Sequence, residues 1–182
     1  EAAQRDIYIS WEDAIGHAWE RYAVVIDNYR AGNYPEHEGM SDEFFHNIAK
    51  AMDAYNRSRE KQQAVWEMIL RKIGFDFDSG RVDIGSHPTI LASSPDDVRV
   101  VNSFAEDDFW GGIFNILHCG GRGIYQQSIS KELMGTLLAE VPSFAVDEAI
   151  CRLYENIIGK SEGFWQYIYE PLVEILPQLK AY

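Results

Sequence analysis

Two pairs of possible metal ligands stand out near the beginning of the sequence. Asp13 and His17 are four residues apart, and Glu43 and His46 are three residues apart. On a helix these spacings bring both side chains of a pair to one face. Helical bundles bind metal ions with carboxylate and imidazole pairs from facing helices. The four residues therefore define one hypothesis, a small helical enzyme or ligand-binding domain with a metal or small-molecule site on its first two helices.

A second pair, His118 and Cys119, has the residue types of a thiol nucleophile and its base. Consecutive residues on a helix point about 100° apart, so the two side chains do not meet unless the helix has unwound. No third orienting group accompanies them. Both cysteines, Cys119 and Cys151, are therefore interpreted as small buried hydrophobic residues, and no catalytic residue is assigned.

Other motif candidates have structural explanations. The cluster 120–123, Gly-Gly-Arg-Gly, follows a helical pattern, so it is interpreted as the end of a helix; a phosphate loop precedes one. The run from Asp76 to Gly80 has its glycine one residue too early for a calcium loop, and the late glutamate is missing. No His-Glu-x-x-His, phosphate-loop or dinucleotide fingerprint is present. The sequence therefore predicts no cofactor and no assigned metal ligand.

Charge points to a different hypothesis. The chain has 182 residues and a formal net charge of −13, which disfavours nucleic acid and anionic membranes as partners and favours a basic protein. Glu106, Asp107 and Asp108 lie next to Trp110, and aromatic side chains rimmed by carboxylates hold Arg or Lys of a partner. The first function predicted is thus a non-catalytic acidic binding protein, of the immunity or inhibitor type. Its acidic residues equally suit the first turn of a helix.

The elements that carry these residues are predicted to be mostly helices. Apolar residues recur at helical spacing from Ser10 to Gly32, and again from Ser41 to Gly74. We interpret the second stretch as one long helix, with two helices joined at 56–58 as the alternative. The runs 75–78 and 81–84 alternate on either side of a turn at 79–80, which predicts a small β-hairpin or an ordered loop within residues 75–101. The valines at 98, 100 and 101 indicate a third short strand.

Helical spacing resumes at Phe104 and is expected to end at Gly120, with further helices from Ser128 or Ser130 to Glu140 and from Phe144 to Ile158. A last helix begins at Ser161, with Pro171 predicted to kink it.

The overall prediction is a mainly α fold with five to seven helices in an irregular bundle, formed by residues 1–182 as a single domain. With two cysteines and no apolar stretch long enough for a membrane span, a cytoplasmic location is expected. The first residue is Glu1, so we expect a processed or trimmed form. The oligomeric state is left open.

Overall fold

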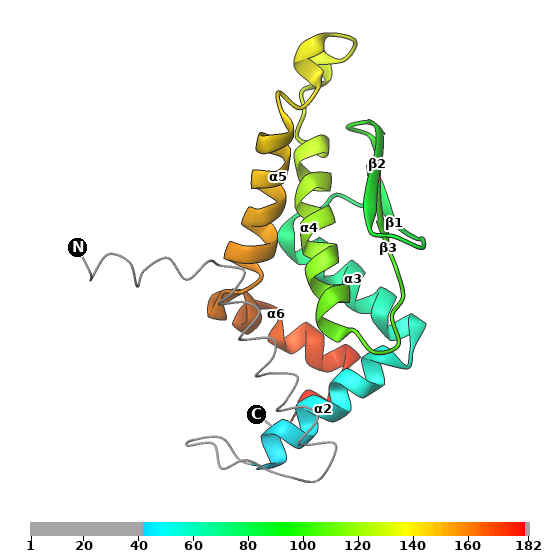
Figure 1. Ribbon diagram of the computed structural model, residues 1–182, viewed down its shortest axis with the longest axis vertical. Coiled ribbons are helices and arrows are strands. Elements are labelled where there is room, and N and C mark those ends of the chain that lie inside the picture. Colours follow the sequence, from blue (N-terminus) through cyan, green and yellow to red (C-terminus); the bar gives the residue numbers. More distant parts are fainter. Residues whose placement is uncertain (1–41, 181–182) are drawn as a thin grey trace, which may run out of the picture. The chain divides into compact units, whose positions relative to one another are not determined.

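The computed structural model describes residues 42–180 (Figure 1). The chain divides into two compact units, residues 1–50 with 181–182 and residues 51–180, so the boundary lies within the first described helix. That division does not test the prediction of a single domain. The helices and strands are α2 (Asp42–Asn56), α3 (Arg59–Ile73), β1 (Gly80–Ile84), β2 (Thr89–Ser94), β3 (Asp97–Asn102), α4 (Phe109–Gln127), α5 (Phe144–Arg152) and α6 (Glu162–Ile175).

The predicted long helix is two helices, as in the alternative interpretation. Helix α2 ends at Asn56, and Ser58 starts α3 by accepting a hydrogen bond from the backbone N–H of Lys61 through its hydroxyl. Such an N-cap satisfies a backbone donor that the helix itself leaves unpaired. Gly74 ends α3 in the left-handed conformation, with a φ of 99° that glycine adopts without strain. Across the break, the indole N–H of Trp66 in α3 donates a 2.7 Å hydrogen bond to the Tyr55 hydroxyl at the end of α2, and both side chains are buried.

The small β element is confirmed, but the predicted hairpin between residues 75 and 84 is wrong. The sheet has the order β1-β3-β2, with β1 parallel to β3 and β2 antiparallel to it. Val82 is opposite Val100, and Val100 is opposite Ile90. The hairpin turn therefore lies between β2 and β3. The central strand β3 carries the buried valines because it has neighbours on both sides.

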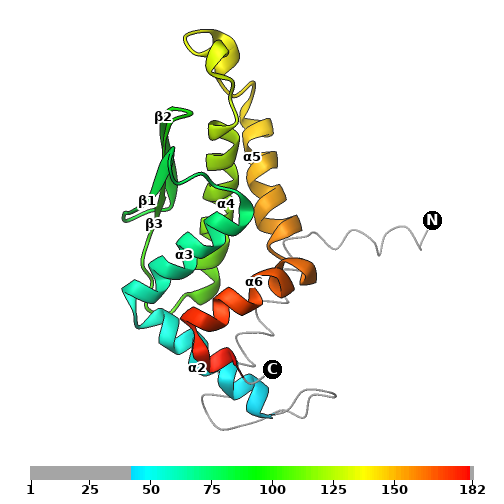
Figure 2. The ribbon, with the colours of Figure 1, turned by 180° about the vertical axis from the view of Figure 1, so that it is seen from behind.

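Helix α4 continues through the glycine cluster at 120–123, where the sequence was expected to end it. It lies between the sheet on one side and α5 on the other (Figures 1 and 2), and it also contacts α3. A side chain at Gly120 would collide with Leu70 of α3, and one at Gly121 would collide with Tyr154. These glycines are therefore contact points at which neighbouring segments approach the α4 backbone closely.

The region after α4 is less helical than predicted. Residues 131–139 form two short 3-10 turns, Lys131–Leu133 and Leu137–Ala139, and Leu137 and Leu138 are exposed. Without an apolar face in contact with a partner, this sequence does not sustain an α-helix. Helix α5 begins at the predicted residue, Phe144, with Ser143 as its N-cap, and continues directly into a π-helical segment, Leu153–Ile158.

Helix α6 begins at its predicted cap, Ser161, and contains Pro171. The core of residues 51–180 includes Trp66, Ile113 and Ile168, all fully buried, at the junction of α3, α4 and α6. No helix among residues 42–180 combines the length and the apolar character that crossing a membrane requires. The mainly helical fold with a small β element is thus confirmed.

Candidate functional site

The acidic residues predicted to bind a partner lie at the start of α4. Glu106, Asp107 and Asp108 are exposed, and the Asp108 carboxylate accepts a 2.7 Å hydrogen bond from the backbone N–H of Gly111. Asp108 is therefore the N-cap of α4, so the acidic cluster precedes the helix and does not form its first turn, which was the alternative interpretation. Trp110 packs against Trp165 of α6, with ring centroids 5.5 Å apart. Binding of a basic partner by these residues stays a prediction.

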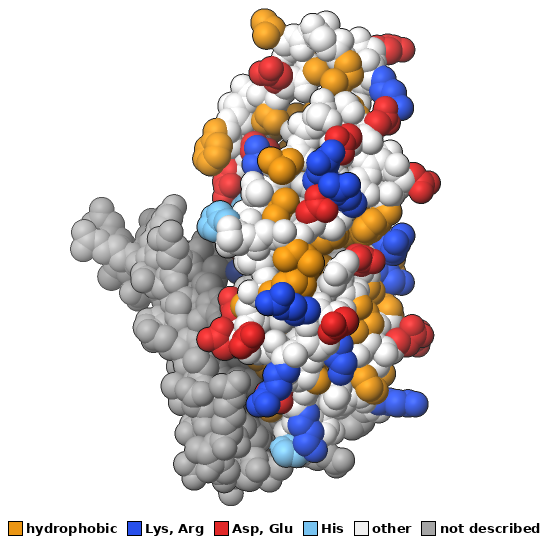
Figure 3. All heavy atoms as spheres, turned by 90° about the vertical axis from the view of Figure 1, so that its right-hand side faces the viewer, with side chains coloured by type: hydrophobic (Ala, Val, Ile, Leu, Met, Phe, Trp, Pro, Cys, Tyr) orange, Lys and Arg blue, Asp and Glu red, His pale blue; other side chains and the backbone are white. Residues whose placement is uncertain are grey.

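The surface that bears the sheet is not uniformly acidic. Figure 3 shows Lys and Arg side chains interspersed with Asp and Glu on this side of the molecule. On β1, Arg81 Nε is 2.9 Å from Asp83 Oδ1, and on β3, Arg99 Nε is 3.0 Å from Asp97 Oδ1. Much of the negative charge here is neutralised locally, so net charge alone does not define an interaction surface.

The predicted metal ligands on the first two helices are not brought together by anything the structure describes. Asp13 and His17 lie outside the described residues. Glu43 belongs to the first turn of α2, where only the backbone is described, and His46 is exposed. A site built from these four residues stays a prediction.

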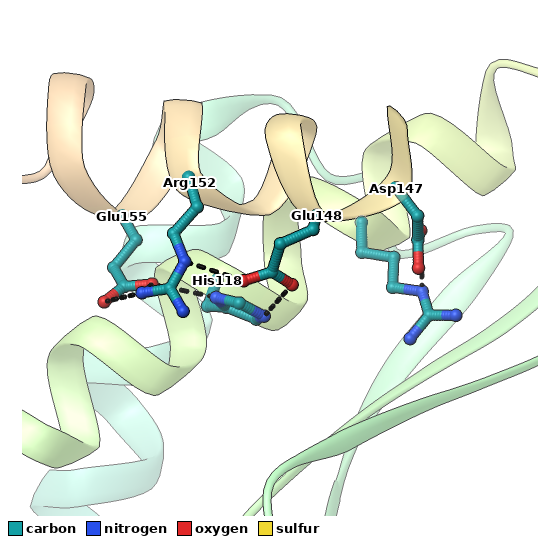
Figure 4. Close-up of polar contacts among 6 residues, drawn as sticks. His118, Asp147, Glu148, Arg152 and Glu155 are labelled. Atoms are coloured by element: carbon teal, nitrogen blue, oxygen red, sulfur yellow. Dashed lines mark hydrogen bonds and ion pairs between the residues drawn. The ribbon is translucent and has the colours of Figure 1, made fainter. Parts of the chain in front are cut away.

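The structure reveals a different cluster, between α4 and the continuous segment formed by α5 and the π helix. His118 of α4 faces Glu148 and Glu155 (Figure 4). Its Nδ1 is 2.8 Å from Glu155 Oε2, and its Nε2 is 3.8 Å from Glu148 Oε2. Both imidazole nitrogens therefore face carboxylates from the neighbouring segment.

Cys151 completes this cluster. One donor atom each from His118, Glu148 and Cys151 lie within 4.8 Å of one another, and these are the residues of the described part that could jointly hold a metal ion. Cys151 is buried, whereas His118 and Glu148 are partly accessible. The arrangement offers one nitrogen, one oxygen and one sulfur donor at the junction of two helices, with access from solvent on one side.

Arg152 is the positive group on the outer side of this cluster. Its Nε donates a 2.7 Å hydrogen bond to Glu148 Oε1, and its Nη1 is 3.3 Å from Glu155 Oε2. Figure 4 shows Arg152 between the two glutamates. The guanidinium therefore fixes both carboxylates relative to each other.

The contacts within this cluster raise the pKa of His118 and lower that of Glu155. Contact with Cys151, and then the hydrogen bond with Glu155, raises the pKa of His118 to about 10, although partial burial opposes the charge. Burial raises the pKa of Glu155, but His118 and Arg152 outweigh it and leave this pKa below its usual value. Without a metal ion, these contacts thus favour the protonated form of the His118 imidazole, alongside the Arg152 guanidinium.

The π-helical segment positions Glu155. Its wide turn is closed by a hydrogen bond from the backbone N–H of Gly159 to the carbonyl of Tyr154, five residues earlier. A side chain at Gly159 would collide with the Glu155 carbonyl and approach Leu117 of α4. The widened backbone therefore packs closely on α4, next to His118.

Cys119 and Arg122, the other polar residues of this part of α4, do not join the cluster. Cys119 is buried, and burial raises its pKa to about 12, so its thiol is neither a nucleophile nor a base. Arg122 Nε is 2.9 Å from Oδ1 of Asp147, a buried residue of α5. The contact of His118 with Cys151, in contrast, was missed from the sequence.

A signal for this cluster existed in the sequence. Glu148, Cys151 and Glu155 follow one another at spacings of three and four, which puts them on one helical face. Finding it required placing that face against His118, and this depends on α4 continuing past its glycines.

Comparisons with known proteins identify the family to which the sequence is similar. Residues 38–182 match the family model described as "Carboxypeptidase Taq (M32) metallopeptidase". "Carboxypeptidase 1" of Bacillus subtilis is 37% identical over 119 residues, which are 65% of this chain and 24% of that protein. "Thermostable carboxypeptidase 1" of Thermus thermophilus is 37% identical over 111 residues, which are 61% of this chain and 22% of that protein.

A solved structure has the same fold. The crystal structure of an M32 carboxypeptidase from Deinococcus radiodurans is similar with a TM-score of 0.64 and 26% identity, over 95% of this chain and 33% of that one. The chain therefore spans about a quarter of the length of the curated relatives it matches.

These findings overturn the first function predicted from charge. The prediction of a non-catalytic binding protein of the immunity or inhibitor type is wrong, because the family and the named relatives are metallopeptidases and carboxypeptidases. The preference for a non-enzymatic function is wrong for the same reason. Net charge reflects the surface as a whole and carries no information on a site formed by a few residues.

Proposed function

Because this chain belongs to the carboxypeptidase Taq (M32) metallopeptidase family, we propose that it contributes a divalent metal centre to a metallocarboxypeptidase. The observation that carries this proposal is the convergence of His118, Glu148 and Cys151 between α4 and α5. Cleavage at the C-terminal end of peptides is the activity that the relatives' names suggest for the whole protein.

The described residues suit a metal ion in their donor set. Imidazole, carboxylate and thiolate are the ligands that zinc takes from proteins, and catalytic zinc sites use three protein ligands. Glu155 contacts Nδ1 of His118 at 2.8 Å, which leaves Nε2 to face the other two donors. A carboxylate that orients a ligating histidine through its second nitrogen is a regular feature of zinc sites.

Each residue has a separate role in this proposal. When bound, a divalent ion polarises a substrate carbonyl and lowers the pKa of a water molecule. His118, Glu148 and Cys151 would hold the ion, Glu155 would orient His118, and Arg152 would fix the two glutamates. The partial exposure of His118 and Glu148 leaves an approach for the substrate.

The chain departs from a widespread arrangement of zinc peptidases. In His-Glu-x-x-His helices, two histidines four residues apart bind zinc and the glutamate acts as general base. Here the five residues from His118 are His-Cys-Gly-Gly-Arg, so Cys119 stands where the glutamate would be and Arg122 where the second histidine would be. Because the Cys119 thiol cannot serve as that base, we expect much slower peptide hydrolysis than in a helix with the full motif.

The proposal is tested by metal binding to the full chain. Protein stripped with chelator and titrated with Zn²⁺ in a calorimeter is expected to bind one equivalent, and a His118→Ala, Glu148→Ala double variant is expected to bind none. Mg²⁺ and Ca²⁺ are expected to bind far more weakly, because the donors include nitrogen and sulfur. Absence of Zn²⁺ binding by the unaltered chain would refute the proposal.

The expected weakness of hydrolysis is tested separately. Zn²⁺-loaded chain is incubated with an N-blocked dipeptide, and release of the C-terminal amino acid is measured against the chelated protein. A Cys119→Glu, Arg122→His variant restores the full motif and is expected to raise the rate, since a positioned base contributes roughly 100-fold or more. The matched control, Arg122→His alone, lacks the base and should not give this increase.

A further inference from the structure

We propose that Cys151 is a thiolate ligand of this metal centre, so that the protein has a His–Glu–Cys set drawn from two segments. This inference rests on the proposed function and deepens it. It assigns to α5 a ligand that the His-Glu-x-x-His arrangement would take from the helix of its first histidine. The residues involved are His118 of α4, with Glu148 and Cys151 of α5.

The distances fit donors that share one ion. Bonds of about 2.0–2.3 Å in tetrahedral geometry put the ligand atoms of one zinc ion roughly 3–4 Å apart. His118 Nε2 and Glu148 Oε2 are 3.8 Å apart, and the donor atoms of all three residues lie within 4.8 Å. Small side-chain adjustments therefore suffice to close the set around an ion.

The second atoms of the two polar ligands are already engaged. His118 Nδ1 contacts Glu155, and Glu148 Oε1 accepts a hydrogen bond from Arg152. In each ligand, one atom is held by the protein and the other faces the common centre. This pattern is independent of the donor distances, and it is what outer partners do when they orient metal ligands.

The charges also match a divalent ion. Glu148, Glu155 and a Cys151 thiolate are opposed by one guanidinium, that of Arg152, within the set of residues in contact. With His118 neutral, as a histidine must be to bind a metal ion, the formal charge left over is minus two, which a Zn²⁺ or Co²⁺ ion would neutralise. The neighbouring pair of Arg122 and Asp147 is neutral by itself.

Arg122 occupies the position of the second histidine in the His-Glu-x-x-His arrangement, so another residue must supply that ligand. Arginine stays protonated in proteins and has no lone pair to offer a metal. Its side chain is paired with Asp147 at 2.9 Å. Cys119 provides no substitute, because it is not among the donors that converge with His118 in the described part of the chain. Cys151, one helical turn after Glu148, supplies the third donor.

The test is cobalt spectroscopy of the full chain. Co²⁺ bound to a thiolate gives a charge-transfer absorption band in the near ultraviolet that nitrogen and oxygen ligands do not produce. We expect one equivalent of Co²⁺ to generate this band in the unaltered protein. Cys151→Ser is expected to abolish the band and to weaken Zn²⁺ binding by at least roughly tenfold. Cys119→Ser is the matched control, also buried, and should retain both.

The outcomes separate this inference from the proposed function. Co²⁺ that binds to the unaltered protein without a thiolate band would overturn the role of Cys151 while leaving a metal centre in place. Failure to bind Co²⁺ and Zn²⁺ at all would overturn the metal centre itself. The band in the unaltered protein and in Cys119→Ser remains decisive even if Cys151→Ser does not fold, because only Cys151 then remains as the thiolate.

Discussion

The start and the middle of helix α4 differ in how their polar residues are used. Near its start, Glu106, Asp107 and Asp108 are adjacent in the sequence, exposed, and engaged at most in capping. Farther along, His118 meets Glu155, which is 37 residues away in the sequence, in a partly buried contact. The run of acidic residues in the sequence therefore marks the start of a helix. The candidate site is marked instead by polar side chains from different helices that meet at an interface.

This difference depends on how closely the segments approach at the second region. The glycines of α4 allow Leu70 and Tyr154 to reach its backbone, and Tyr154 precedes Glu155 in the π-helical segment. At the first region no such approach is needed, because a capping residue works at the surface. Substitutions at the two regions should therefore change the free energy of unfolding and the Zn²⁺ affinity by unequal amounts.

The largest effect is expected at Gly121. Gly121→Ala places a methyl group against Tyr154, and overpacking of this kind costs about 1–3 kcal/mol. The free energy of unfolding from urea denaturation should fall by about this amount, and Zn²⁺ affinity should fall as well because Glu155 moves with Tyr154. Gly163→Ala in α6 is the matched control, since nothing lies within 4 Å of the added carbon. Equal stabilities of the two variants would contradict close packing at Gly121.

An intermediate effect is expected at Arg122. Arg122→Ala leaves the buried Asp147 carboxylate without its ion-pair partner. Because Arg122 is itself 40% exposed, we expect a loss of about 2 kcal/mol, less than for a fully buried pair. Thermal denaturation of Arg122→Ala, Asp147→Asn and the double variant forms a cycle. Additive losses would show that the two side chains do not interact.

The smallest effects are expected at the acidic start of α4. Asp108→Ala removes the N-cap and should cost about 1 kcal/mol in the free energy of unfolding. A Glu106→Gln, Asp107→Asn variant should stay within about 0.5 kcal/mol of the unaltered protein, because both residues are exposed. Zn²⁺ binding should be unchanged in all of these. A large loss of metal affinity in the second variant would erase the distinction between the two regions.

Local features of the fold were predictable from the sequence. Helix starts at Phe144 and Ser161 and a short strand at the valines of β3 were predicted, because helix starts and alternation depend on neighbours in the chain. The partner of β1 was not predictable in this way. A parallel pairing joins residues that are separated along the chain, and the local turn at 79–80 pointed to a hairpin instead.

The candidate site was missed for a physical reason. Glycines at 120–123 have low helix propensity, which made termination the reasonable interpretation. Tertiary contacts on several sides of α4 outweigh that propensity, and they are invisible in a single sequence. With the helix expected to end at Gly120, nothing in the sequence placed Glu148 and Cys151 of α5 beside His118.

The π-helical turn has a consequence for how this region can change. Its wide turn absorbs one extra residue, so α5, which carries Glu148 and Cys151, stays in phase with the turns that follow. Loss of one residue from Leu153–Ile158 with a return to the ordinary helical pitch would therefore leave the two sides nearly in phase. A deletion within α5, where the pitch is ordinary, would instead rotate its two ends relative to each other by about 100°. The π-helical segment should therefore tolerate the loss of one residue more readily than α5 does.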